Sequence, residues 1–148
     1  DYLVWVKNQF VLGRKDYKPR HEFVYYGWKG KHKFYGPNNR STILEFDKPH
    51  SSENHPTMKP IPLFRQLIED GSQKGAFVYD PFCGSGTSIL ACCMEPQRIC
   101  RAMELSPKYC DVIVNRWVEF RNQKGEEASV IRNGKKVKWS EDAQKDAA

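Results

Sequence analysis

Residues 76–87 read AFVYDPFCGSGT, an apolar run that leads through an acid and a glycine-rich turn to a hydroxyl. The apolar residues favour a strand over 76–80, and the residues after the turn predict a helix from Thr87 to about Met94. Gly84 and Gly86 let the backbone approach a bound molecule closely, and the N–H groups of the first helical turn point outward. The stretch therefore predicts a ligand site at the tip of a strand.

Two common classes of ligand conflict with this turn. A phosphate-binding P-loop needs a Lys before its Thr, but Gly86 precedes Thr87 directly. A dinucleotide site needs a further glycine where Ile89 stands, and Asp80 would repel a phosphate. Asp80 suits an ammonium group instead, and Glu104, at the end of the next strand, can accept both hydroxyls of a ribose. The set fits S-adenosylmethionine, with a structural turn and a solvated Glu104 as the alternative.

Strands and helices alternate on both sides of the turn. We expect a strand over Ile99–Glu104 and a helix from Pro107 to about Arg121, with the Ser106 hydroxyl as its N-cap. A strand, a helix and a strand with such short connections form a βαβ unit with parallel strands. Upstream, Pro62 opens a helix that runs to about Asp70 and ends at Gly71.

The first 46 residues predict an antiparallel pair of strands and a short third strand. Leu3–Val6 and Phe23–Tyr26 are β-branched and aromatic, and the polar loop between them favours an antiparallel hairpin. A short strand follows at Ile43–Phe46, and Asn133-Gly134 predicts a tight hairpin near the C-terminal end. Three strand aromatics are expected in the core: Trp5, Phe23 and Tyr25.

Length and composition are those of one domain with a core of its own. The chain has 148 residues, 39% hydrophobic and 28% charged. No apolar run approaches the roughly 18 residues needed to cross a bilayer, and the first residues lack the features of a signal peptide. Five cysteines, an odd number without CxxC spacing, support neither a disulfide framework nor a zinc site. We therefore expect a reduced, cytoplasmic setting with small, buried, unpaired cysteines.

Positive charge is concentrated in the first part of the chain. The net charge is +6, and residues 1–60 hold 11 Lys and Arg against 6 Asp and Glu. Residues 61–124 are nearly balanced, with 8 against 7. Such a distribution indicates a polyanionic partner for the N-terminal part, with an ordinary solvated surface as the alternative.

Taken together, these motifs resemble a known family. HPTMKP (55–60), DPFCGSGT (80–87) and MELSPKYCDV (103–112) resemble the amino-methylating DNA methyltransferases, more narrowly their beta class. Upstream, VWVKN (4–8), HEFVYYGWK (21–29) and LEFDKP (44–49) are similar to the family's hairpin and to its approach to the proline motif. The resemblance covers about residues 3–121.

The resemblance implies a fold, a reaction and a domain plan. The fold is α/β, a Rossmann-like S-adenosylmethionine-dependent methyltransferase fold that is incomplete at the N-terminal side. The reaction is methylation of an exocyclic amino group in double-stranded DNA, N6 of adenine being preferred to N4 of cytosine. Residues 1–124 form the methyltransferase domain, with a hairpin and basic loops over 1–54 and the cofactor-binding part over 55–124. Outside the resemblance, the local pattern predicts a short hairpin and a polar tail over residues 125–148.

The resemblance also implies site residues. The cofactor-binding residues are His55, Thr57, Lys59, Asp80, Pro81, Phe82, Cys83, Gly84, Ser85, Gly86, Thr87, Glu104 and Leu105. The DNA-contacting residues are the cations of two loops, interleaved with aromatic side chains: Arg14, Lys15, Lys18, Arg20, Lys31 and Lys33. No metal is implied.

The sequence departs from the family's pattern in three places. Met58 and Ser106 replace residues common elsewhere in the family, without changing the backbone shape. More seriously, the catalytic tetrapeptide, an acidic or polar residue followed by two prolines and an aromatic, is absent from these 148 residues. We therefore expect this chain alone to be inactive. Its open sheet edge would be covered by a missing N-terminal part or by a homodimer partner.

The missing tetrapeptide keeps two other functions open. A non-catalytic nucleic-acid-binding module could retain the methyltransferase fold. A methyltransferase acting on RNA or on a small molecule would share the cofactor turn, but it would leave the basic hairpin loops without a role.

Overall fold

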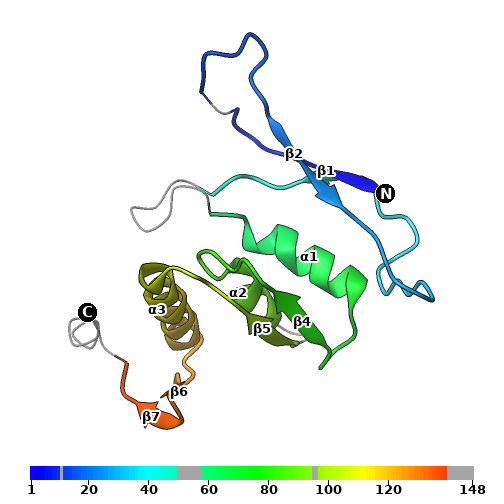
Figure 1. The fold of residues 1–148 in the computed structure, drawn as a ribbon. Coiled ribbons are helices and arrows are strands. Elements are labelled where there is room, and N and C mark those ends of the chain that lie inside the picture. Colours follow the sequence, from blue (N-terminus) through cyan, green and yellow to red (C-terminus); the bar gives the residue numbers. More distant parts are fainter. Residues whose placement is uncertain (11, 50–57, 95–96, 140–148) are drawn as a thin grey trace.

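A computed structural model describes residues 1–10, 12–49, 58–94 and 97–139 (Figure 1). The first three strands are β1 (Tyr2–Val6), β2 (His21–Tyr25) and β3 (Ile43–Glu45). β1 and β2 pair antiparallel, with Trp5 opposite Glu22, and β3 pairs parallel with β1 so that Trp5 lies beside Leu44. The hairpin and the third strand predicted from sequence are therefore confirmed, in the order β2-β1-β3.

Helix α1 (Ile61–Gly71) covers one face of this sheet. Pro62 lies in the first turn, where a missing N–H costs nothing, and the helix ends at Gly71 as predicted. Leu63 of α1 packs with Trp5 and Leu44, each at most 3% exposed, and these three side chains form the centre of the core. Leu3, Phe46, Phe64 and Leu67 extend this cluster.

Two of the strand aromatics lie outside this core. Trp5 is buried as predicted, but Phe23 is 63% exposed and Tyr25 is 79% exposed, so the prediction that they are core residues is wrong. Successive side chains of a strand point to opposite faces. Glu22 and Val24 share the face that α1 covers, because they pair with Trp5 and Leu3. Phe23 and Tyr25 therefore point to the opposite face, which no described element buries.

The glycine turn lies in a second, parallel pair of strands. β4 (Phe77–Asp80) pairs with β5 (Ile99–Ala102), and α2 (Thr87–Cys93) connects them along the chain. The predicted βαβ unit is confirmed. α3 (Pro107–Gln123) follows, with Ser106 at its N-cap position. The expected side-chain cap is not made, because Ser106 forms no hydroxyl hydrogen bond to the helix.

Among the described residues the strands form separate sheets, and α1 lies between the hairpin and the β4–β5 pair (Figure 1). The third sheet is the hairpin of β6 (Val130–Arg132) and β7 (Lys135–Val137). Its turn residues, Asn133 and Gly134, have φ of 50° and 77°, as the predicted tight turn requires.

The cysteines are unpaired, but they are not all buried. Cys83 and Cys92 are buried, Cys93 and Cys100 are half-buried, and Cys110 is exposed. Cys110 is thus an exception to the expected burial. No helix within the described ranges is both long enough and apolar enough to span a membrane.

Candidate functional site at the tips of β4 and β5

The turn after β4 is fixed by its own acid and by two glycines. The backbone N–H of Phe82 donates to the Asp80 carboxylate at 3.0 Å. Gly84 and Gly86 have φ of 55° and 80°, in the left-handed region, and Gly86 forms the N-cap of α2. A Cβ on Gly86 would lie 3.0 Å from Ile113 of α3, so both the backbone angle and the packing require glycine there.

Glu104 joins the tips of the two strands. Its carboxylate accepts hydrogen bonds from the backbone N–H of Gly84 at 2.8 Å and of Ser106 at 2.9 Å. The backbone also links the tips, because the N–H of Met103 donates to the Asp80 carbonyl at 2.9 Å. A carboxylate has about four acceptor positions, so Glu104 can hold the turn and still accept hydroxyl groups from a ligand.

The opposite side of the turn packs against α2 and α3. Arg116 of α3 donates to the carbonyl of Ser85, and the Cys83 thiol lies 3.6 Å from the hydroxyl of Ser88. Burial raises the pKa of the Cys83 thiol above its ordinary value of 9.0, so it is protonated and unreactive at neutral pH. Cys83 and Arg116 therefore support the shape of the turn.

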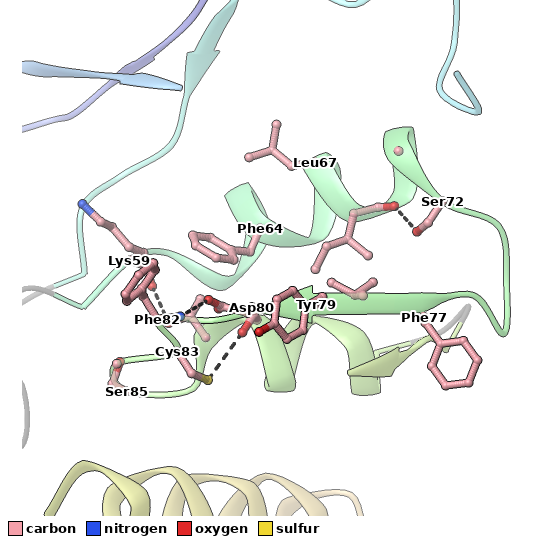
Figure 2. Close-up of a pocket in the computed structure, with 16 residues that line it drawn as sticks. Lys59, Phe64, Leu67, Ser72, Phe77, Tyr79, Asp80, Phe82, Cys83 and Ser85 are labelled. Atoms are coloured by element: carbon pink, nitrogen blue, oxygen red, sulfur yellow. Dashed lines mark hydrogen bonds between the residues drawn. The ribbon is translucent and has the colours of Figure 1, made fainter. Parts of the chain in front are cut away.

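An open cavity of about 620 Å³ begins at this turn and runs along β4 (Figure 2). Its volume lies in the range of sites for small molecules and cofactors. One wall is apolar and comes from α1 and β4, and the polar end is the turn itself. The residues of the apolar wall are Phe64, Leu67, Ile68, Phe77, Val78 and Tyr79. The residues at the polar end are Lys59, Asp80, Phe82, Cys83, Gly84, Ser85 and Thr87.

The predicted cofactor residues divide into three groups. Seven of them line the cavity: Lys59, Asp80, Phe82, Cys83, Gly84, Ser85 and Thr87. Pro81, Gly86, Glu104 and Leu105 belong to the turn or to the tip of β5 without lining it. Phe82 and Leu105, beside the two carboxylates, are 89% and 97% exposed. His55 and Thr57 lie outside the described residues.

Lys59 is held by the hairpin. Its carbonyl accepts a hydrogen bond from the Thr87 hydroxyl at 3.3 Å, but its ammonium forms an ion pair with Glu22 of β2. Figure 2 shows this nitrogen pointing away from Asp80 and Phe82. The ammonium also lies 5.3 Å from the centre of the Trp5 ring. In this arrangement the backbone of Lys59 borders the turn, while its charge is neutralised at the end of β1 and β2.

Glu22 is a residue that the sequence prediction missed. Its carboxylate accepts hydrogen bonds from the ammonium groups of Lys59 and Lys7. The Lys7 nitrogen lies at 3.3 Å, and the Lys7 side chain is only 4% exposed. Burial tends to raise the pKa of Glu22, but the hydrogen bonds and charges of Lys59 and Lys7 outweigh it and leave the pKa below 4.5. The strand pattern held a signal for this role, because an acid at the inward position opposite Trp5 needs a charged partner.

The two basic loops lie at opposite ends of α1. The loop with Arg14, Lys15 and Lys18 begins after β1, at the end where Lys59 contacts Glu22 and Thr87. The loop with Lys31 and Lys33 is fixed at the other end of the helix. There the N–H of Tyr35 donates to the Asp70 carbonyl at 2.8 Å, and Arg40 pairs with the Asp70 carboxylate. Because β1 and β2 are antiparallel, the two groups of cations leave this strand pair at opposite ends.

Comparison with known proteins gives a consistent picture. A family model described as DNA methylase matches residues 1–115. The chain is 32% identical over 145 residues to the type II methyltransferase M.Cfr9I of Citrobacter freundii, covering 88% of this chain and 46% of that protein. It is 28% identical over 114 residues to M.HpaI of Haemophilus parainfluenzae, covering 62% of this chain and 36% of that protein. The chain thus spans less than half the length of these relatives.

Solved structures show the same relationship. The crystal structure of an M1.HpyAVI–SAM complex has a TM-score of 0.65 and 28% identity, covering 79% of this chain and 61% of that chain. PvuII DNA methyltransferase, described as cytosine-N4-specific, has a TM-score of 0.59 over 99% of this chain and 54% of that chain. At 17% identity this second match shows the fold alone.

Proposed function

Because the chain belongs to the N6/N4 DNA methylase family, we propose that it is the cofactor-binding half of a DNA amino-methyltransferase. The reaction would transfer the methyl group of S-adenosylmethionine to an exocyclic amino nitrogen in double-stranded DNA, N6 of adenine or N4 of cytosine. The observation that carries this proposal is the pair of carboxylates, Asp80 and Glu104, held at neighbouring strand tips by the glycine turn.

Each part of the site matches one part of the proposed cofactor. Asp80 would accept the α-ammonium group, and Glu104, oriented by two backbone N–H groups, would accept the ribose hydroxyls. Gly84 allows the ligand to approach the backbone, and the exposed rings or chains of Phe82 and Leu105 would cover the adenine. The cavity beside the turn has sufficient volume for such a molecule.

The contribution of this chain to the reaction would be placement. The cofactor supplies a methyl group on a sulfonium, which already has a good leaving group. The residues of the turn hold the nucleoside and its amino-acid end in one orientation, so that the methyl group faces the target amine. The target base must leave the stacked duplex, which costs a few kcal/mol, and contacts to the DNA backbone offset that cost.

The loop between β1 and β2 is the proposed source of those contacts. Its cations, Arg14, Lys15, Lys18 and Arg20, follow the end of the hairpin at which Glu22 pairs with Lys59, the residue that borders the cofactor turn. Cations of this kind bind phosphate without reading sequence. Lys31 and Lys33 lie beyond the other end of α1, so contacts from them would fall on flanking DNA.

Calorimetric titration with S-adenosylhomocysteine tests the cofactor site. We expect the wild-type chain to bind, and Asp80→Ala and Glu104→Gln each to weaken binding at least about tenfold, because each removes a charge-assisted hydrogen bond. Glu127→Gln is the matched control, since its exposed carboxylate lies in the C-terminal hairpin region, paired with Lys136 at 3.7 Å. Unchanged affinity in both site variants, or no binding by the wild type, would contradict the proposal.

A second candidate function is a non-catalytic module that binds nucleic acid, which is favoured by the basic residues 1–60, with 11 Lys and Arg against 6 Asp and Glu. In both cases we propose that these 148 residues alone do not methylate DNA. The two functions differ in cofactor binding, because a module that retained only the fold has no need of the two carboxylates. Transfer of labelled methyl to DNA by the isolated chain would contradict the proposed inactivity, and analysis of the modified nucleoside would then identify the base.

A further inference from the structure

Four side chains form a charged junction between the hairpin and the cofactor turn. They are Trp5 of β1, Lys7 directly after β1, Glu22 of β2, and Lys59 just before α1. Glu22 stands between the two lysines and accepts a hydrogen bond from each. Both ammonium groups also lie over the Trp5 ring, at 5.8 Å for Lys7 and 5.3 Å for Lys59. We call these four residues the hairpin junction.

The hairpin junction reaches the cavity wall through one residue, Lys59. Lys59 lines the cavity, and its carbonyl is bonded to Thr87, the first residue of α2. Its side chain is 38% exposed, so its charge is only partly screened by water. The Lys59 ammonium lies on the hairpin side, so its charge acts on a ligand in the cavity through space, and Glu22 sets how much of that charge is neutralised.

The junction carries one negative and two positive charges in the folded protein. Without the Glu22 carboxylate, the Lys59 ammonium would lie without its partner carboxylate beside that of Lys7, which is almost fully buried. The extra positive charge would repel a cationic ligand and would have no comparable effect on a neutral one. The proposed cofactor and its product differ in this property, because S-adenosylmethionine has a cationic sulfonium where S-adenosylhomocysteine has a neutral thioether.

We propose that Glu22 is a positioning residue that sets the preference of the cavity for the sulfonium cofactor over its neutral product. It acts through Lys59, by fixing the ammonium group on the hairpin side and by neutralising its charge. This inference rests on the proposed function, since it assumes that the cavity beside Asp80 binds S-adenosylmethionine. It adds that a residue of β2, which belongs neither to the glycine turn nor to residues 55–60, sets the ratio of the affinities for S-adenosylmethionine and S-adenosylhomocysteine.

The test compares the affinities of S-adenosylmethionine and S-adenosylhomocysteine in the full chain by calorimetry at low salt. Glu22→Gln should weaken binding of S-adenosylmethionine by about three- to tenfold relative to S-adenosylhomocysteine. Lys59→Gln removes one positive charge and should shift the ratio of affinities in the opposite direction. The double variant restores the wild-type net charge of the junction and should restore the wild-type ratio. The shifts should shrink as salt rises, because salt screens charge.

Glu69→Gln is the matched control, because Glu69 also forms an ion pair, with Arg65 at 2.7 Å, but lies towards the other end of α1. This variant should leave the ratio of affinities unchanged. If Glu22→Gln weakened both ligands equally, or neither, Glu22 would have only a structural role and the inference would be wrong. If the wild type bound neither ligand, the proposed function itself would fail, so the two failures are distinguishable. Should Glu22→Gln not fold, an unchanged ratio of affinities in Lys59→Gln would still overturn the inference, because Glu22 is proposed to act through the charge of Lys59.

Discussion

At the scale of single residues, the turn after β4 depends on partners from other elements. Glu104 comes from beyond β5, Ile113 and Arg116 come from α3, and each touches a different residue of the turn. Gly86 is the most constrained of these turn residues, because a left-handed backbone angle and a close neighbour coincide there. The glycines of the chain allow these two constraints to be separated experimentally.

Substitution of three glycines by alanine should give a graded loss of stability. Gly27→Ala should have little effect, because its added Cβ meets no atom within 4 Å and its φ is not left-handed. Gly30→Ala, at φ +75° but in open space, should cost about 1–2 kcal/mol. Gly86→Ala combines φ +80° with a contact of 3.0 Å to Ile113 and should cost more, about 2–4 kcal/mol. Urea denaturation of each variant measures the order, and equal losses for Gly30→Ala and Gly86→Ala would refute the packing argument.

At this scale, the sequence indicates positions that follow from local pattern. Asp80 and Glu104 were expected near each other because acids at the ends of consecutive parallel strands lie at one edge of a sheet, and their roles toward a cofactor stay predictions. The role of Glu22 was not found, because its partner Lys59 is 37 residues away and the contact exists only after α1 packs on the hairpin. The Ser106 cap was also predicted but is not made: the hydroxyl forms no hydrogen bond to α3, and the backbone N–H of Ser106 donates to Glu104 instead.

At the scale of elements, prolines, glycines and the alternation of residues predicted nearly every strand and helix. The boundaries differ by one or two residues, as when β5 ends at Ala102 and leaves Glu104 in the connection. The side-chain period of a strand assigns residues to two faces, but it does not indicate which face another element covers. Phe23 and Tyr25 were misplaced for this reason, since they lie on the face opposite α1.

The last turn of α1 allows a test with adjacent acids. Asp70 is 7% exposed and accepts three hydrogen bonds from Arg40, which fix the loop after β2 to the helix. Asp70→Asn should therefore cost about 1–3 kcal/mol of unfolding free energy, because a buried charge-assisted pair is lost. Glu69→Gln, which breaks a half-buried pair between residues four apart on the helix, should cost less than about 0.5 kcal/mol. Chemical denaturation compares the two, and equal costs would mean that the Arg40 pair does not anchor the loop.

At the scale of the whole molecule, the hairpin places its two loops at opposite ends. An antiparallel pair of strands sends the loop after β1 to one end of the sheet and the loop after β2 to the other. Charge counting along the sequence merged the two loops into one positive region of residues 1–60, because it contains no information on direction. Only the loop after β1 is at the end of the cofactor turn.

This arrangement predicts unequal contributions to DNA binding. Replacing Arg14, Lys15 and Lys18 by alanine should weaken binding and reduce the slope of log affinity against log salt by about three. Replacing Lys29, Lys31 and Lys33 removes the same charge from the loop at the far end, and we expect a slope change of less than about one. Fluorescence anisotropy with a labelled duplex at several salt concentrations measures both slopes. A larger effect from the second set would reverse the assignment of the DNA-facing end.

The exposed aromatics of the strands have a practical consequence for handling the protein. Phe77 and Tyr79 of β4 are 68% and 65% exposed, like Phe23 and Tyr25 of β2, and each of these strands has one edge without a partner among the described residues. An unpaired strand edge next to exposed aromatic side chains is a surface through which protein molecules associate during purification. The apparent molar mass from light scattering should thus rise with concentration unless a companion polypeptide, or a second copy, shields those strands.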